Sequence, residues 1–508
     1  MRPKSSYFVI SPWAAAALVA AACVLYAAAY ARLWNHSALC DVDAEAAVAA
    51  GDWLWRHKPM LREVSVEHGP GDLWLTVPFL ALFGEGRTAL FLRNGAFGVL
   101  GVIACAALAY EFEAGTLGAA AAALFLALTP SWARNSVEGV FTCIASCALA
   151  PLSLALWLRS ARERRPSLAL ASALALGVAL SARSTMLGWT LGMAAAAAAG
   201  ALPSPWAGIS AFRRRAGAGA CAALFLLPQA PLALHVLLSP DFRRSWAAKL
   251  FHPAPGHYAL AGDMVVRLRQ LWVLFAAPDS YIAVLLAGAA ALAALAARGK
   301  RFRRDDLPWI LAACYVVLSL LRPSGLGNYH LLPLVPLLAA AVCALPAKAG
   351  RRRLAFSVLA VLLVWRAATF ARDSRDPFLN GESHCREATL ELYAYFAARP
   401  GSRPIFLGDF MVPVFELVSK GAIRPLNVAP QMPEAEASAA WNAAFEARES
   451  LFVVSARYTT MELAKRFRAE ASGRRLKARL EREFTADDGS ITYQVFRVER
   501  REPRARGG

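Results

Sequence analysis

The chain has 508 residues, of which 57% are hydrophobic and only 18% are charged, and its mean hydropathy is +0.41. Ordinary soluble domains are about 45–50% apolar and about 25% charged, so the composition argues against a water-soluble globule. The formal net charge is +19, but the basic residues lie between apolar segments and form no single basic face. This pattern favours orientation in a bilayer over the binding of nucleic acid.

The apolar runs are concentrated in the first three quarters of the chain. We predict a transmembrane domain over residues 1–371, followed by a small mixed domain over residues 372–496. Residues 497–508 are basic and low in apolar residues, which predicts a disordered tail. The nine cysteines form no CxxC pair and lie mostly in apolar runs, so neither a disulfide framework nor a zinc site is expected.

Apolar segments of about 20 residues predict eleven membrane spans. In chain order these are 11–33, 88–110, 115–130, 139–158, 167–183, 184–201, 217–238, 271–297, 307–322, 329–346 and 354–371. The first of them is longer than the apolar part of a signal peptide, which favours an uncleaved span.

Basic loops orient these spans. With the N-terminus in the cytoplasm, four basic clusters share the cytoplasmic side: Arg159–Arg165, Arg213–Arg215, Arg298–Arg304 and Lys348–Arg353. The positive-inside rule therefore predicts a multi-pass protein of the inner (plasma) membrane with its C-terminal domain outside the cytoplasm.

Two features depart from that rule. The short cytoplasmic turn with Glu111 and Glu113 carries no basic residue, and the outer loop 239–270 carries several. The other sizeable outer loop covers residues 34–87.

The first outer loop begins with three carboxylates, Asp41, Asp43 and Glu45. On a helix Asp41 and Glu45 would share one face, with Asp43 turned away, whereas an extended turn would align all three. Carboxylates are favoured near the positive end of a helix, so a solvated helix start is one interpretation. The other is a general base, because partial desolvation at a membrane edge raises the pKa of a carboxylate.

The same loop contains the segment Asp72–Phe83, which is apolar but too short to span a bilayer. It predicts an interfacial or re-entrant helix. His68 precedes this helix and is expected near the bilayer surface, either as a structural hydrogen-bonding residue or as a ligand-binding one.

Helix and strand patterns alternate in the C-terminal region, which predicts a small α/β sandwich. The expected helices are Arg386–Ala398, Val412–Lys420, Glu434–Ala447 and Thr459–Ala471, and the expected strands are Pro404–Leu407, Leu451–Ser455, Leu480–Thr485 and Ile491–Val498. No phosphate-binding glycine motif or catalytic triad is visible there.

The order of several motifs resembles a known family. An acidic motif (DVDAEAAVAAGDW) is followed by a turn into a short apolar helix (EHGPGDLWLTVPFLALFGEG) and by a span that opens with an arginine (FLRNGAFGVLGVIACAALAY). The outer turn from Leu128 to Glu138 and the segment Asn328–Pro336 extend the likeness. In these motifs the chain resembles the integral-membrane glycosyltransferases of the GT-C class, in particular protein O-mannosyltransferases and lipid A aminoarabinose transferases.

The resemblance implies inverting transfer of a hexosyl or pentosyl group from a polyprenyl-phosphate donor to an acceptor at the outer membrane face. The acceptor would be a lipid, a glycan or a protein, and membrane lipids would be further partners. Asp43 would be the catalytic base, with Asp41 and Glu45 as its neighbours. The substrate-binding candidates are His68, Arg134, Glu138, Arg183, Arg322, Tyr329, His330, Arg243 and Arg244.

Several of these candidates are arginines at a membrane edge. Burial of an unpaired arginine there is costly, so a lipid phosphate is a suitable partner for such a residue. Snorkelling to lipid headgroups is the alternative for Arg183 and Arg322. The sequence does not decide whether the site binds a divalent cation, because paired acids beside a phosphate either bind such a cation or act without one.

The chain also departs from the family. Ala44 separates Asp43 from Glu45 where the family has adjacent acids, and Gly69 stands in the family's His-Pro-Pro turn. Glu138 occupies a position where aspartate is commoner. The alternative functions are a lipid-linked saccharide ligase or polymerase and a polytopic transporter or flippase, although no internal repeat supports the latter.

Overall fold

The structure of the chain is a computed structural model. It describes residues 10–36, 41–56, 70–138, 144–207, 210–238, 304–320, 331–348 and 352–375 and, with gaps, residues 386–500.

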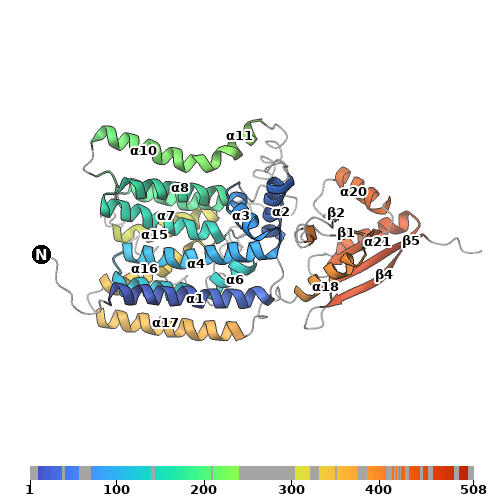
Figure 1. Cartoon of the computed structure of the whole chain (residues 1–508), viewed down its shortest axis with the longest axis horizontal. Coiled ribbons are helices and arrows are strands. Elements are labelled where there is room, and N and C mark those ends of the chain that lie inside the picture. Colours follow the sequence, from blue (N-terminus) through green and yellow to red (C-terminus); the bar gives the residue numbers. More distant parts are fainter. Residues whose placement is uncertain are drawn as a thin grey trace, which may run out of the picture.

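The first part of the chain, up to residue 375, is a bundle of helices whose longer members run side by side (Figure 1). Its helices are α1 (Pro12–His36), α2 (Asp41–Arg56), α3 (Pro70–Phe83), α4 (Arg87–Glu111), α5 (Gly115–Ala127), α6 (Pro130–Glu138), α7 (Ile144–Glu163), α8 (Pro166–Ala182), α9 (Leu187–Ala198), α10 (Ala211–Leu226), α11 (Ala230–Leu238), α15 (Leu307–Leu320), α16 (Leu334–Lys348) and α17 (Arg352–Arg375). Short 3-10 turns are η1 (Ser184–Met186), η2 (Leu227–Gln229) and η3 (Arg304–Asp306).

Each predicted span in the described part of the chain coincides with one or more of these helices, while the span 271–297 lies outside it. Four helices there are long and apolar enough to cross a membrane: Pro12–Trp34, Arg87–Glu111, Ile144–Glu163 and Ala211–Leu238. A fifth is obtained if α5 and α6, which are bent by 53°, count as one broken span. The mostly helical chain with several apolar helices is confirmed, and the count of eleven spans stays a prediction.

The first outer loop differs from the prediction, because it holds two helices instead of one. The predicted short apolar helix is α3, and α2 precedes it and packs against it. Helix α3 also contacts α4 and α8, so this loop is folded onto the bundle. The basic cluster Arg213–Arg215 likewise differs, since it lies in the first turns of α10 and not in a loop.

Glycines on one face of α4 let α1 approach closely. A Cβ on Gly95 would lie 3.0 Å from the Tyr30 ring, and a Cβ on Gly98 would collide with the Tyr26 hydroxyl. The Tyr30 hydroxyl donates a hydrogen bond to the Phe91 carbonyl at 2.9 Å. Small residues at helix interfaces in membranes allow such close packing of backbones.

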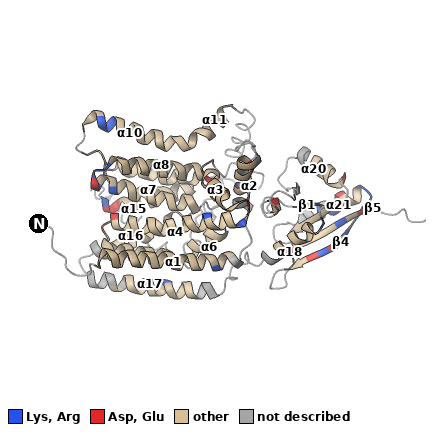
Figure 2. Ribbon diagram, in the orientation of Figure 1, with Lys and Arg blue, Asp and Glu red and all other residues tan. Residues whose placement is uncertain are grey.

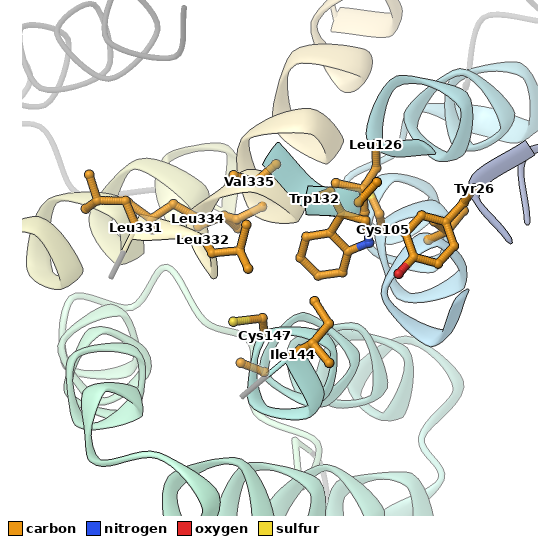
Figure 3. Close-up of a cluster of buried hydrophobic side chains, with 14 of the residues drawn as sticks. Tyr26, Cys105, Leu126, Trp132, Ile144, Cys147, Leu331, Leu332, Leu334 and Val335 are labelled. Carbon is orange, nitrogen blue, oxygen red and sulfur yellow. The ribbon is translucent and has the colours of Figure 1, made fainter. Parts of the chain in front are cut away.

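Helix α6 docks on the same face of α4 through Trp132. The fully buried indole lies against Gly101, and its Nε1 donates to the Gly98 carbonyl at 3.2 Å. Figure 3 shows the indole inside a cluster with Tyr26 on one side, Leu332 on the other, and Ile144 of α7 close by. This contact fixes the short helix that carries Arg134 and Glu138.

Charged residues gather at the end of the bundle remote from the sheet region (Figure 2). Glu111, at the end of α4, is buried and pairs with Arg162 of α7 at 2.9 Å and Arg304 of η3 at 3.9 Å. Arg304 also lies 3.5 Å from Glu113. The acidic turn that departs from the basic pattern is therefore neutralised by arginines from two other turns on the predicted cytoplasmic side.

The C-terminal region forms a five-stranded sheet in the order β2-β1-β3-β5-β4. The strands are β1 (Arg403–Leu407), β2 (Leu426–Val428), β3 (Ser450–Ser455), β4 (Leu476–Thr485) and β5 (Ile491–Arg500), and the helices are α18 (Arg386–Ala397), α20 (Glu434–Glu446) and α21 (Met461–Gly473). Strands β2, β1 and β3 are parallel, and β5 pairs antiparallel with β3 and β4.

This sheet has apolar side chains on both faces. In β3, Leu451 and Val453 belong to the cluster with Phe396 of α18, whereas Phe452 belongs to the cluster with Trp441 of α20. Helices therefore cover both faces of the sheet. The strand β2 is not among the predicted elements, and most of the predicted helix 412–420 lies outside the described residues. Strand β5 runs to Arg500, so the first residues of the predicted tail are strand.

A polar network ties α18 to the sheet. The Tyr395 hydroxyl donates to Glu481 Oε1 at 2.7 Å, and Arg497 Nε donates to Glu481 Oε2 at 2.7 Å. Burial and the neighbouring Glu481 carboxylate raise the pKa of Tyr395 to about 12. The phenol thus stays protonated and keeps this contact across the physiological pH range.

Candidate functional site

The acidic motif lies at the start of a helix. Helix α2 begins at Asp41, so its first two turns contain all three acidic residues. The backbone here is helical and not an extended turn, so positions 41 and 45 share a face of the helix and position 43 does not. The positive end of the α2 dipole favours negative charge here. In Figure 1, α2, α3 and α6 lie at the end of the bundle that faces the sheet region.

The first turn of α3 is held against the end of α8. The Gly71 backbone N–H donates to Ser181 Oγ at 3.0 Å, and that hydroxyl donates to the Pro228 carbonyl of η2 at 2.7 Å. A Cβ on Gly71 would lie 2.7 Å from the Ala182 nitrogen and 2.9 Å from the Val178 carbonyl oxygen. Only glycine permits this approach, and we call the contact the α3–α8 junction.

A buried ion pair lies next to this junction. Asp72, the residue after Gly71, pairs through Oδ1 with Arg93 Nη2 of α4, and both side chains are at most 1% exposed. Arg93 Nη1 also donates to Asn94 Oδ1 at 3.3 Å. An ionised pair this deep in a bundle has a large desolvation cost.

Arg183 follows the junction directly. It caps the C-terminal end of α8 with extended backbone (φ −149°, ψ 119°) and is only 6% exposed. Within the described part of the chain, its Nη1 atom has no hydrogen-bond partner. A buried guanidinium nitrogen that has no partner in the described part of the chain is available to bind a ligand.

A second buried polar atom lies on the helix that packs beside α8. Ala145 of α7 and Ala182 of α8 form a small buried cluster with Leu75 and Phe97 packed against it. The residue after Ala145 is Ser146, whose hydroxyl is buried and has no hydrogen-bond partner among the described residues. Four helices, α3, α4, α7 and α8, therefore meet at the junction, where Ser146 of α7 and Arg183 at the end of α8 each carry a buried polar atom without a partner in the described part of the chain.

The other predicted residues are distributed as follows. Arg134 is partly buried in α6, and Glu138 is the last residue of that helix. The remaining candidates lie outside the described residues: His68, Arg243, Arg244, Arg322, Tyr329 and His330. Among the residues that the structure describes, no three His, Cys, Asp or Glu side chains form a group that could hold a metal ion.

Several buried charged residues are not among the predicted site residues, including Asp72, its partner Arg93, and Arg366. Asp72 follows the Gly-Pro-Gly turn into α3. Arg366 in α17 is fully buried, and its guanidinium lies 5.3 Å from the Phe125 ring centroid and 5.0 Å from that of Trp365. The signal that would have found them is an ionisable residue within an apolar stretch, which marks functional positions in membrane proteins.

The fold is similar to that of solved membrane enzymes. Over 96% of the chain, it matches ArnT from Cupriavidus metallidurans bound to undecaprenyl phosphate, with a TM-score of 0.61, 14% identity and 98% of that chain covered. The apo state of the same ArnT matches with a TM-score of 0.63, 14% identity and coverage of 94% of this chain and 97% of that chain.

An oligosaccharyltransferase is also similar. The Archaeoglobus fulgidus protein, in complex with Zn and sulfate, matches with a TM-score of 0.51, 12% identity and coverage of 93% of this chain and 72% of that chain. No family model matches the sequence, and no curated protein matches it in sequence. The chain has the GT-C fold, which confirms the resemblance to that class at the level of the fold.

Proposed function

Because the chain has the GT-C fold, we propose that it is a membrane glycosyltransferase that transfers a sugar from a polyprenyl-phosphate-linked donor. The observation that carries this proposal is the match to ArnT bound to undecaprenyl phosphate, which extends over 96% of this chain and 98% of that one. The site chemistry supports it independently: α3 packs against α2, which begins with the acidic motif, and against α8, whose C-cap Arg183 is buried with an Nη1 that has no partner among the described residues.

The reaction needs two kinds of group. The acceptor must lose a proton as it attacks the anomeric carbon, and Asp43 is the base that we propose, with Asp41 and Glu45 as its neighbours in sequence. The leaving group is a lipid phosphate, whose developing charge requires cations and not a strong acid. Arg183 is the cation that we propose for it, together with Arg322, and the product would have inverted configuration.

Binding of undecaprenyl phosphate tests the role of Arg183. A planar guanidinium binds phosphate through two parallel hydrogen bonds, which an ammonium group does not reproduce. Each charged hydrogen bond contributes about 1.5–3 kcal/mol, so Arg183→Ala, which removes both bonds, should weaken binding by at least about 100-fold. Arg183→Lys should also weaken it. Affinity would be measured by thermal unfolding of the purified protein with increasing undecaprenyl phosphate.

The matched control is Arg159→Lys, at the charged end of the bundle. Arg159 is exposed and pairs with Glu163 at 2.8 Å, so its replacement should leave the affinity unchanged. Wild-type affinity in both Arg183 variants would contradict a contact between Arg183 and the lipid phosphate.

We further propose that the protein lies in the inner membrane with the sheet region outside the cytoplasm. Its support is the gathering of Glu111, Arg162 and Arg304 at the bundle end remote from the sheet region. Reporter fusions at Gly350 and Gly401 should therefore report opposite sides of the membrane. The same side for both would exclude this orientation and the outward-facing site with it.

A further inference from the structure

Stability alone does not explain the ion pair of Asp72 and Arg93. Removal of two charges from water costs several kcal/mol for each ion, and their attraction repays this cost only with good geometry. Replacement of such a pair by apolar residues of similar volume is often neutral or stabilising. A buried pair that adds little stability can still fix the arrangement of the elements that carry it.

The ion pair and the adjacent α3–α8 junction together connect three helices near the first turn of α3. Asp72 is in the first turn of α3 and Arg93 is in α4, while the preceding Gly71 is bonded to Ser181 at the end of α8. Helix α3 is thereby fixed at its first turn from two sides. Helix α3 also packs against α2, whose first five residues include the three carboxylates.

We infer that Asp72 and Arg93 are a positioning pair that fixes α3 between α4 and α8 and so holds the acidic start of α2 in place for sugar transfer. This inference rests on the function proposed above. Neither residue touches the reacting atoms in this arrangement, and each acts through α3. The end of α8 has its own contact to η2, through Ser181 and Pro228, so Arg183 does not depend on the ion pair.

Because these attachments are separate, loss of the ion pair should affect the acidic motif and the lipid phosphate site differently. Loss of the pair should move the acidic motif but leave the lipid phosphate site intact. A displacement of about 1 Å at a reacting group lowers a rate by about 10²-fold. We therefore expect a lower kcat with unchanged affinity for undecaprenyl phosphate.

The experiment compares two variants of the full chain in detergent micelles. Asp72→Asn leaves Arg93 buried without its ionised partner and is expected to fold poorly. The double variant Asp72→Leu/Arg93→Met removes both charges at similar volume and should unfold at the wild-type temperature. In that double variant, hydrogen exchange should rise at least about tenfold in 41–56 and 70–83 but not in α7 and α8.

The control is Arg159→Gln/Glu163→Gln, which removes an exposed ion pair at the other end of the bundle. It should change neither exchange nor transfer. The inference is overturned if the double variant shows wild-type exchange in α2 and α3, or if unfolding temperature, phosphate affinity and transfer all fall together, as a purely structural pair predicts. If the wild type binds no undecaprenyl phosphate, the proposed function fails, whereas the exchange data still decide whether the pair fixes α3 and α2.

Discussion

We expect Asp43→Asn to lower the rate of sugar transfer by about 10²–10⁴-fold, the range that a positioned general base contributes. Asparagine keeps the shape of the side chain but does not accept the acceptor's proton. Transfer would be measured with a polyprenyl-phosphate sugar donor and the purified full chain. The unfolding temperature should change little, because the residue lies in the first turn of α2 and not in the packed middle of the bundle.

The neighbouring acids provide internal controls for this experiment. Helical geometry separates position 43 from positions 41 and 45, so Asp41→Asn and Glu45→Gln should have smaller effects. The largest loss in one of these variants would assign the base to that residue instead. Wild-type transfer in all three variants, with normal folding, would reduce the motif to a solvated helix start and remove the chemical support for a base on α2.

We expect Gly101→Ala to destabilise the bundle. A Cβ at this position would collide with the indole of Trp132, whose Nε1 donates to the Gly98 carbonyl at 3.2 Å. Overpacking of this kind costs about 1–3 kcal/mol, which exceeds the about 0.5–1 kcal/mol that alanine gains over glycine in a helix. Thermal unfolding in detergent would show a lower midpoint.

A matched control is Gly219→Ala in α10, where a Cβ would meet no atom within 4 Å. That variant should be as stable as the wild type or more so. Trp132→Phe makes room at the contact, so the double variant with Gly101→Ala should lose less than the sum of the two single losses. Equal midpoints for Gly101→Ala and Gly219→Ala would contradict a tight contact between α4 and α6.

The apolar helices could be predicted from sequence because their signal is local. The predicted span 88–110 corresponds to α4 (Arg87–Glu111), and the predicted helix 72–83 corresponds to α3 (Pro70–Phe83). Hydrophobic length and the Gly-Pro-Gly turn suffice for these two elements. Strand β2 has only three residues, which is too short for an alternating pattern to be recognised.

The candidate site was predictable in part. Arg183 could be named from its position at a span end, but its burial, and the lack of a partner for its Nη1 among the described residues, depend on helices distant in sequence. The partner of Asp72 is Arg93 on the next helix, and no local pattern marks that pairing. Tertiary contacts decide which of several intramembrane charges are paired, and the sequence alone does not contain those distances.

The charged cluster around Glu111 has a consequence for the order in which the chain assembles. Arg304 Nη2 donates to the Glu111 carbonyl at 2.6 Å across 193 positions of sequence. During synthesis Glu111 leaves the ribosome long before Arg304, so α4 and α5 enter the membrane with their connecting turn only partly neutralised. Arg162 supplies the first counter-charge and η3 the last, which means that the N-terminal helices reach their final electrostatic environment only after more than half of the protein has been made.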